Sequence, residues 1–174
     1  MKNFWFNTKT FKIVCKGKIT LEELYYVLEH SNHFKFQFEN ILENSTPSQI
    51  ESYIINKKEL CLYFNLSKLT NKEIKSILYF HSDLWPFLNL SLLTSNDITL
   101  LLSVHNELKK IFDVNKLPIS DLMFLACEFS HLHDVIDFRK FDFTRLQMIC
   151  EQHPHLRKNF SLFYWIKSFF KYLF

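Results

Sequence analysis

Hydrophobic and polar positions repeat along this chain with a period of 24 residues. Residues 45–68, 69–92, 93–116, 117–140 and 141–164 fall into one register without a gap, and residues 19–44 fit as a degenerate first copy with two extra residues. In each copy, apolar residues occupy positions six, nine and ten, for example Ile74, Ile77 and Leu78 in the third copy. This spacing forms one stripe on a helical period of 3.6 residues. The pattern therefore predicts a long amphipathic helix in every copy.

Capping residues mark where each long helix is expected to begin. Position two carries Thr20, Thr46, Thr70 and Thr94, and Glu, Gln or Asp follows three residues later. This spacing predicts a capping box, in which the threonine hydroxyl accepts a hydrogen bond from a free backbone amide and the later side chain accepts one in return. Pro118 and Asp142 take position two in the last two copies, and aspartate also caps helices well.

A second, shorter helix is predicted in the other half of each copy. Asn32, Ser82, Asn106 and Ser130 at position fourteen are expected to cap it, and a leucine at position sixteen pairs with an apolar residue at position twenty. A four-residue connector such as 65–68 follows. Stacking about six such two-helix copies predicts an all-α protein, an α-solenoid in which each repeat packs on its neighbours. The alternative is a β/α horseshoe with strands in the connectors, and it is disfavoured because at most four residues per copy could be strand.

Both ends of the chain are expected to close the core of a single repeat domain spanning 1–174. Residues 1–18 predict a small hairpin-like cap. Residues 165–174 predict a capping helix, because Trp165, Ile166 and Phe169 share one face with Phe170 and Leu173. A membrane-surface or dimerisation helix is the alternative for this tail.

The period and several motif residues resemble a known class of repeats. The residues that carry the likeness are Asn65-Leu66-Ser67-Lys68-Leu69, His153-Pro154-His155-Leu156, and the histidines His81, His105 and His153 at position thirteen. They are similar to the 24-residue helical repeats of the leucine-rich-repeat-variant family and to repeat arrays of some bacterial proteins. The resemblance implies an α-helix alternating with a short 3₁₀ helix in a right-handed superhelix. The founding type carries an N-terminal iron–sulfur cluster, but only Cys15 lies in this region here, so no cofactor is expected.

The composition excludes several classes of function. With a single glycine among 174 residues, the chain has no glycine-rich phosphate loop, dinucleotide fingerprint or G-x-S-x-G nucleophile elbow. Four dispersed cysteines favour reduced thiols over a disulfide framework. We see no signal peptide, and no apolar run reaches the roughly 18–20 residues of a membrane span. We therefore expect a cytoplasmic protein with no membrane partner.

Candidate chemistry in the sequence is sparse. Histidines at position thirteen end the long helix, where they can bond its last carbonyls. The pairs His131-x-His133 and His153-x-His155 come closest to ligand spacing, but neither has the i, i+4 geometry of a zinc-binding helix. Cys127 precedes His131 by four residues, yet nothing marks it as a reactive thiolate. We expect no metal site and no enzymatic activity.

Positions eight and twelve project away from the core stripe and form the most informative surface. From the third copy onward they carry the apolar residues Phe80, Leu100, Val104, Phe124 and Met148. They could widen the apolar arc between neighbouring helices or line a groove for a partner, since large exposed apolar patches mark interaction sites. Arg139, Arg145 and Arg157 would extend such a groove electrostatically or form an ordinary solvated edge. We predict that these eight residues contact a partner.

These observations together favour a non-catalytic protein-binding module. The most specific hypothesis is an immunity protein that binds and blocks a cognate bacterial toxin, as in contact-dependent inhibition. The formal net charge of +3 counts against a basic nuclease as that toxin, because acidic inhibitors are the electrostatic expectation. The alternatives are a general interaction adaptor and a helical-repeat protein that binds nucleic acid through its basic C-terminal copies. Nucleic acid is the less expected partner, because positions eight and twelve show no recurring base-reading pairs.

Overall fold

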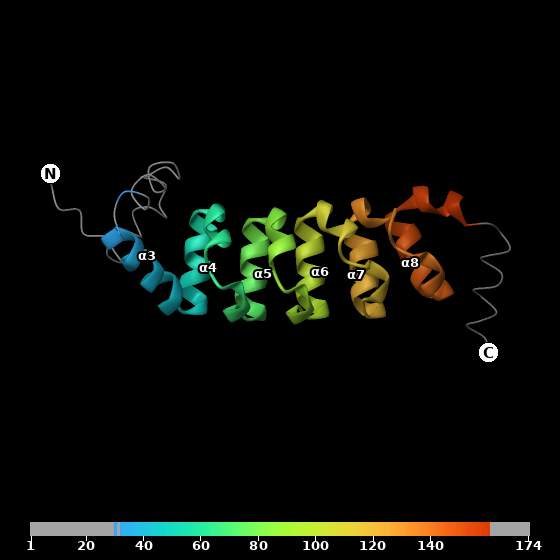
Figure 1. Ribbon diagram of the computed structural model, residues 1–174. Coiled ribbons are helices and arrows are strands. Elements are labelled where there is room, and N and C mark those ends of the chain that lie inside the picture. The colour runs from blue at the N-terminus through green and yellow to red at the C-terminus, as the bar shows by residue number, and fades with distance from the viewer. Residues whose placement is uncertain (1–29, 31, 161–174) are drawn as a thin grey trace. The chain divides into compact units, whose positions relative to one another are not determined.

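The computed structural model describes residue 30 and residues 32–160, which form helices and turns without a strand. The ten-residue α-helices α4 to α8 begin at intervals of 24 residues, as the apolar pattern predicts (Figure 1). The α-helices are α3 (Asn32–Asn44), α4 (Pro47–Asn56), α5 (Asn71–Phe80), α6 (Ser95–Val104), α7 (Ile119–Glu128) and α8 (Phe143–Gln152). The predicted cap at 1–18, the tail at 165–174, and residues 19–29 and 31 of the first copy lie outside the described residues.

Between the α-helices run 3₁₀ helices. The short helix of each copy is η1 (Lys58–Leu62), η3 (Ser82–Phe87), η5 (Asn106–Lys110), η7 (Ser130–Leu132) or η9 (Pro154–Asn159). The connectors are η2 (Leu66–Lys68), η4 (Leu90–Leu92), η6 (Val114–Lys116) and η8 (Phe138–Lys140). An α-helix thus alternates with 3₁₀ segments, as the resemblance implies. No helix in the described part of the chain is long and apolar enough to cross a membrane.

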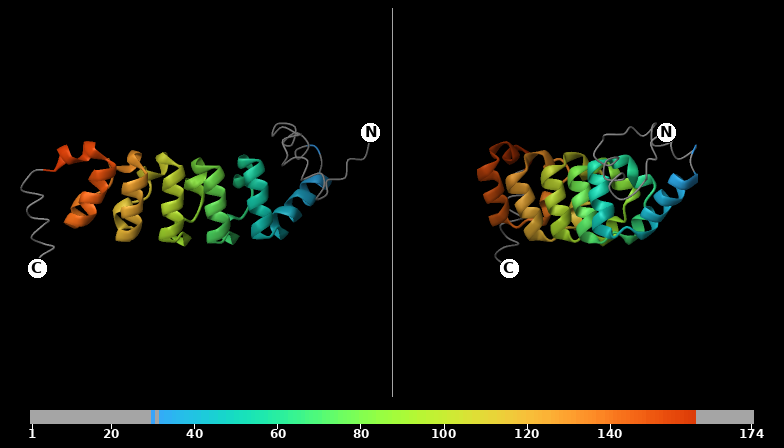
Figure 2. Two further views of the ribbon diagram at one scale, coloured as in Figure 1. Left: turned by 180° about the vertical axis from the view of Figure 1, so that it is seen from behind. Right: turned by 90° about the vertical axis from the view of Figure 1, so that its left-hand side faces the viewer.

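The chain divides into two compact units, residues 1–93 and residues 94–174, here called unit 1 and unit 2. In unit 1, α4 packs against α5; in unit 2, α6 packs against α7, and α7 packs against α8. The α-helices of each unit lie side by side in both views of Figure 2.

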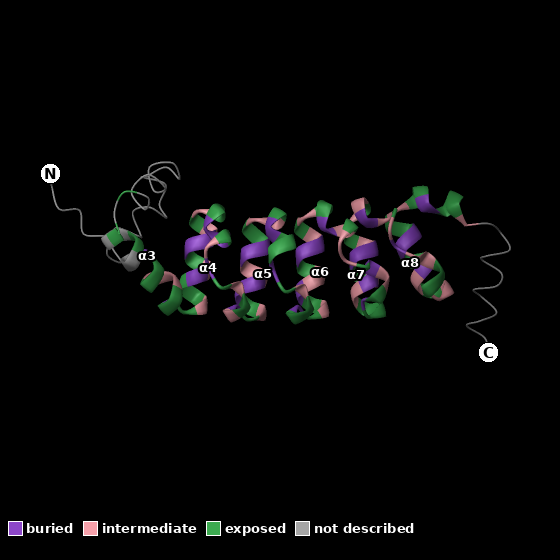
Figure 3. Cartoon of the chain, viewed as in Figure 1, coloured by how far each residue is buried: buried purple, intermediate pink, exposed green. Residues whose placement is uncertain are grey.

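The predicted stripe forms the core of both units (Figure 3). Positions nine and ten of α4 to α8 are all buried, as is the leucine at position sixteen of each short helix. Position six is buried in every one of these helices except α6, where Ile98 is half-buried. The position-sixteen residues are Leu60, Leu84, Leu108, Leu132 and Leu156. Each copy therefore buries apolar side chains between its α-helix and its 3₁₀ helix.

The predicted helix caps are present in the described copies. Thr46 and Gln49 form a reciprocal capping box on α4, and Thr94 and Asp97 form the shorter variant on α6. At α5 the Glu73 carboxylate accepts a hydrogen bond from the backbone N–H of Thr70, 3.1 Å away. On α8, Asp142 accepts one from the backbone N–H of Arg145, 2.9 Å away, whereas Pro118 makes no side-chain cap on α7.

The connectors differ from the strands of the alternative β/α fold. Each begins with Asn65, Asn89, Asp113 or Asp137, whose side chain accepts a hydrogen bond from the backbone N–H two residues later. This local bond closes a tight turn and competes with extended structure. The four described connectors are 3₁₀ turns for this reason, and the β/α horseshoe is wrong for them.

The first copy and the short-helix caps also depart from expectation. Residues 32–44 form one continuous α-helix where a short helix and a connector are predicted. Ile41 stands where the later copies have the connector Asn or Asp, so nothing caps a turn there. Ser82, Asn106 and Ser130 are the first residues of their 3₁₀ helices, and the cap position falls one residue earlier without a side-chain cap bond.

Candidate functional site

Four large apolar side chains lie exposed on consecutive helices of unit 2. Leu100 and Val104 on α6 are 44% and 47% exposed, and Phe124 on α7 and Met148 on α8 are each 50% exposed. Because α7 packs against both α6 and α8, positions eight and twelve of these helices face the same side. We call this surface the outer face of unit 2. The prediction that these residues point away from the core is confirmed.

The same helix positions of unit 1 are more polar. Ser52 and Asn56 on α4 are exposed, and Ser76 on α5 is half-buried. Phe80, at the end of α5, is 58% exposed and packs edge-on against Tyr79, with ring centroids 5.5 Å apart. The predicted apolar line therefore divides, with Phe80 in unit 1 and the other four residues in unit 2.

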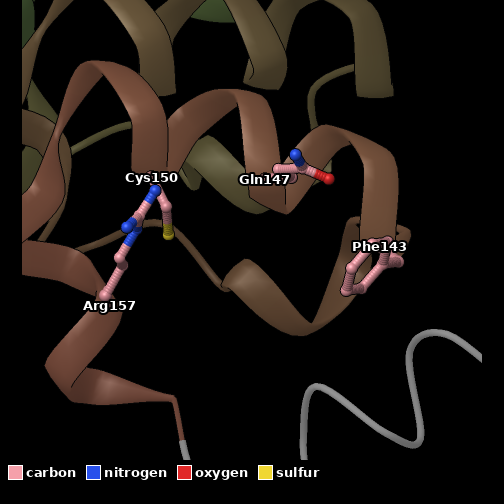
Figure 4. A pocket seen from close by; sticks show the side chains of 4 residues that line it. All are labelled: Phe143, Gln147, Cys150 and Arg157. Atoms are coloured by element: carbon pink, nitrogen blue, oxygen red, sulfur yellow. The ribbon is translucent and has the colours of Figure 1, made fainter.

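The three predicted arginines do not form one basic border. Arg139 lies in the connector η8 and pairs with Asp137 at 2.8 Å. Arg145, in the first turn of α8, pairs with Asp142. Arg157, in η9, lines a hollow of about 350 Å³ together with Phe143, Gln147 and Cys150 of α8. Figure 4 shows Arg157 close to Cys150, with Gln147 and Phe143 farther along the helix.

Two carboxylates of the outer face were not among the predicted site residues: Glu128, which the sequence places at position twelve, and Glu151, next to that position on α8. Glu128 is the last residue of α7, and Glu151 lies in the last turn of α8; both are exposed. Glu151 accepts a hydrogen bond from the Gln147 amide at 3.0 Å. In the described part of unit 2, neither carboxylate forms an ion pair. The signal was available, because an acidic residue at a helix C-terminus opposes the macrodipole.

Two of the histidines at position thirteen, His81 and His153, bond a different helix from the one predicted. His81 Nε2 lies 2.9 Å from the carbonyl oxygen of Ile55 on α4, and His153 Nε2 lies 2.6 Å from that of Cys127 on α7. In the fifth copy, where Phe129 takes position thirteen, His131 Nε2 lies 3.3 Å from the Leu102 carbonyl oxygen on α6. An imidazole that ends one helix thus satisfies a C-terminal carbonyl of the preceding helix. We call His81, His131 and His153 the histidine clamps, because each hydrogen-bonds the preceding copy.

Three imidazoles gather at the end of unit 2. The ring centroid of His133 lies 4.6 Å from that of His153 and 5.6 Å from that of His155. His133 Nε2 bonds the Ala126 carbonyl oxygen at 2.8 Å, while its Nδ1 is buried without a hydrogen-bond partner. Burial lowers the pKa of His133, so its neutral form is favoured. Across the residues that the structure describes, no group of three or more His, Cys, Asp or Glu is placed to hold a metal ion.

The Cys127–His131 pair is not arranged as an activated nucleophile. Burial raises the pKa of the Cys127 thiol, which disfavours the reactive thiolate. The Nε2 atom of His131 is occupied by the Leu102 carbonyl. Burial likewise raises the pKa of Cys61 and Cys150, whose thiols are free and buried.

Comparisons with known protein families, with curated proteins and with solved structures find no match for this chain. The resemblance to leucine-rich-repeat-variant proteins rests on the 24-residue period and its motif residues. We therefore infer the function from the residues of the site itself.

Proposed function

We propose that this chain is a non-catalytic protein-binding module and that the outer face of unit 2 is its contact surface. The supporting observation is the group of four half-exposed apolar side chains on α6, α7 and α8. Folded proteins seldom leave such side chains contiguous on a surface unless a partner covers them. Phenylalanine and methionine, two of the four, are enriched at the centres of protein interfaces.

We further infer that the copies continue as an α-solenoid of about six repeats with a cap at each end. Contacts between consecutive copies support this arrangement. The Lys68 ammonium donates to the Glu43 carbonyl in unit 1, and the Lys140 ammonium donates to the Asn115 carbonyl in unit 2. Each pair is 25 residues apart in sequence. Repeat arrays stacked in this way offer extended surfaces for binding other proteins.

The specific form we propose is a cytoplasmic immunity protein that occupies a cognate bacterial toxin. An inhibitor that blocks a cleft by occupying it needs a complementary surface and no reactive groups of its own. The outer face of unit 2 meets that need, since its apolar centre is flanked by the exposed polar residues Ser120, Thr144 and Gln152.

Affinity capture from the source cells tests the binding function. The full chain is compared with F124S/M148S and with the control W85S/F87S, which removes two exposed apolar side chains from unit 1. We expect one protein to be retained by the wild type and the control and lost by F124S/M148S, with all three chains showing the same circular dichroism. Equal retention by both variants, or no specifically retained protein, would contradict the proposal.

Co-expression tests the immunity form. Expression of the captured protein alone should stop growth, and the wild-type chain should restore growth where F124S/M148S does not. If the captured protein alone does not stop growth, the immunity form is contradicted and the chain is a general interaction adaptor. Nucleic acid in place of protein in the eluate, released by high salt, would favour the nucleic-acid alternative.

A further inference from the structure

We infer that the partner of the outer face is a basic protein surface, in which an apolar patch is bordered by lysine or arginine side chains. The inference rests on the proposed function and adds the chemistry of the partner. It is carried by the charges that border the outer face.

The distribution of ion pairs in unit 2 singles out two carboxylates. Most acidic residues of the described part are engaged within the chain. Ion pairs join Asp113 to Lys116, Asp134 to Lys109, Asp137 to Arg139 and Asp142 to Arg145, and the Glu107 carboxylate lies 3.4 Å from the His105 imidazole. Asp97 and Asp121 accept hydrogen bonds from Thr94 and Ser120. In this part of the chain, Glu128 and Glu151 alone are acidic residues that contact neither a basic side chain nor a hydroxyl donor, and both border the outer face.

Their place on the helices makes the local potential more negative. The C-terminal carbonyls of a helix carry a partial negative charge, which basic residues usually offset. The last turns of α6, α7 and α8 contain no basic residue. Glu128 and Glu151 add full negative charges to the ends of α7 and α8. This arrangement disfavours the isolated helices, and a cation supplied from outside would relieve it.

In the described part of unit 2, every lysine and arginine except Arg145 lies in a 3₁₀ helix, and Arg145, three residues before Met148 on α8, pairs with Asp142. Lys109 and Lys110 belong to η5, and Arg157 and Lys158 belong to η9. These 3₁₀ helices pack their leucines against the core side of the α-helices, away from positions eight and twelve. The net charge of +3 for the chain therefore gives no guide to this face, whose centre is apolar and whose border carries the unpaired carboxylates Glu128 and Glu151 together with the ion-paired Arg145. The electrostatic objection to a basic partner, raised by the net charge, does not apply to this face.

An apolar centre with an acidic border selects for one kind of partner. Burying the apolar surface of Phe124 and Met148 favours binding but does not distinguish one apolar partner from another. Covering Glu128 or Glu151 is tolerated only if a cation pairs with it, because an unpaired charge loses its hydration. Opposite charges across the interface also speed association and reject acidic surfaces.

Selection from a phage-displayed library of random peptides on the immobilised full chain tests this inference. We expect the enriched peptides to combine aromatic or aliphatic residues with lysine or arginine. Their binding should weaken by about 10-fold or more in E128K/E151K, as expected for loss and reversal of complementary charge. The control E39K/E59K makes the same change of net charge at exposed positions of unit 1 and should bind normally. Binding should also weaken as salt rises from about 50 to about 500 mM.

The outcomes separate this inference from the proposed function. Peptides that need Phe124 and Met148 but are neutral or acidic, or that ignore E128K/E151K, would overturn the basic partner and leave the binding face standing. Peptides that ignore F124S/M148S, or no enrichment at all, would overturn both. Self-association of the chain in sedimentation velocity, abolished by E128K/E151K, would assign the face to a second copy and overturn the foreign partner.

Discussion

Units 1 and 2 share one internal plan, but unit 1 exposes apolar side chains on its 3₁₀ helices as well as on α5, whereas the described part of unit 2 exposes them on its α-helices. In unit 1 the exposed apolar residues include Leu62, Trp85 and Phe87, all on the 3₁₀ helices η1 and η3. In unit 2 the equivalent 3₁₀ positions carry charged residues such as Lys110 and Lys158, and the α-helices carry the apolar ones. Positions nine, ten and sixteen are buried in both. The architecture therefore depends on a few inward positions, which leaves the outward positions free to carry separate functions.

The largest expected effect tests whether equivalent buried positions contribute equally to the free energy of unfolding in the two units. Ile77 in unit 1 and Leu125 in unit 2 both occupy position nine and are fully buried. Ile77→Ala and Leu125→Ala should each lower the free energy of unfolding by about 2–5 kcal/mol, measured by urea unfolding. Leu62→Ala, at an exposed position, is the control and should cost well under about 1 kcal/mol. A small loss at either buried site would show that the copies are not equivalent.

Lowering the pH should distinguish the two units, because the cluster of three histidines lies in unit 2. Burial, and to a lesser degree the neighbouring His153, His155 and His131, lowers the pKa of His133, which the Ala126 carbonyl and the Phe138 ring also contact. Since the unfolded chain then binds the proton more readily, stability is complete above about pH 6.5 and falls as pH drops below it, through the lowered folded pKa.

Urea unfolding at descending pH measures this loss, which one proton limits to about 1.4 kcal/mol per pH unit. His133→Gln should flatten the profile, whereas His155→Asn at an exposed position should change it less. Carboxylates of lowered pKa, such as Glu73 and Asp137, contribute stability that is lost only at more acidic pH. An unchanged profile in His133→Gln would refute the role of His133.

The histidine clamps should matter equally in both units. His81→Ala and His153→Ala each remove a hydrogen bond to a carbonyl of the preceding helix, and each should cost about 1 kcal/mol in urea unfolding. Glutamine at the same positions can donate to the carbonyl and should restore part of the loss. If glutamine restores nothing, packing of the imidazole and not its hydrogen bond ties the copies together.

The smallest expected effect compares the neutral connector cap Asn65 in unit 1 with the charged cap Asp137 in unit 2. Asn65→Ala and Asp137→Ala should each cost about 0.5–1 kcal/mol, because each removes a side-chain bond to the backbone of its connector. Asp137 also pairs with Arg139, so part of its loss should disappear at high salt. Equal salt dependence of the two variants would contradict this difference.

Sequence reasoning predicted those features that depend on local chemistry. The 24-residue period, the buried stripe and the threonine caps follow from short-range spacing, and the structure confirms them. It failed where a side chain contacts another copy. His81 and His153 hydrogen-bond the preceding helix, and spacing within one copy cannot predict such a contact. The exposed residues Leu100, Val104, Phe124 and Met148 could be placed outside the core from helical geometry. Glu128 and Glu151 were not among the predicted site residues, because their significance depends on where the cations of unit 2 are engaged.

The hydrogen bonds that join consecutive copies span only about 25 residues of sequence, as for Lys68 with Glu43 and Lys140 with Asn115. Such contacts give a low contact order, and chains of low contact order close small loops and fold quickly. Within unit 1 and within unit 2, two copies joined in this way can therefore form early in folding, before contacts between residues far apart in sequence.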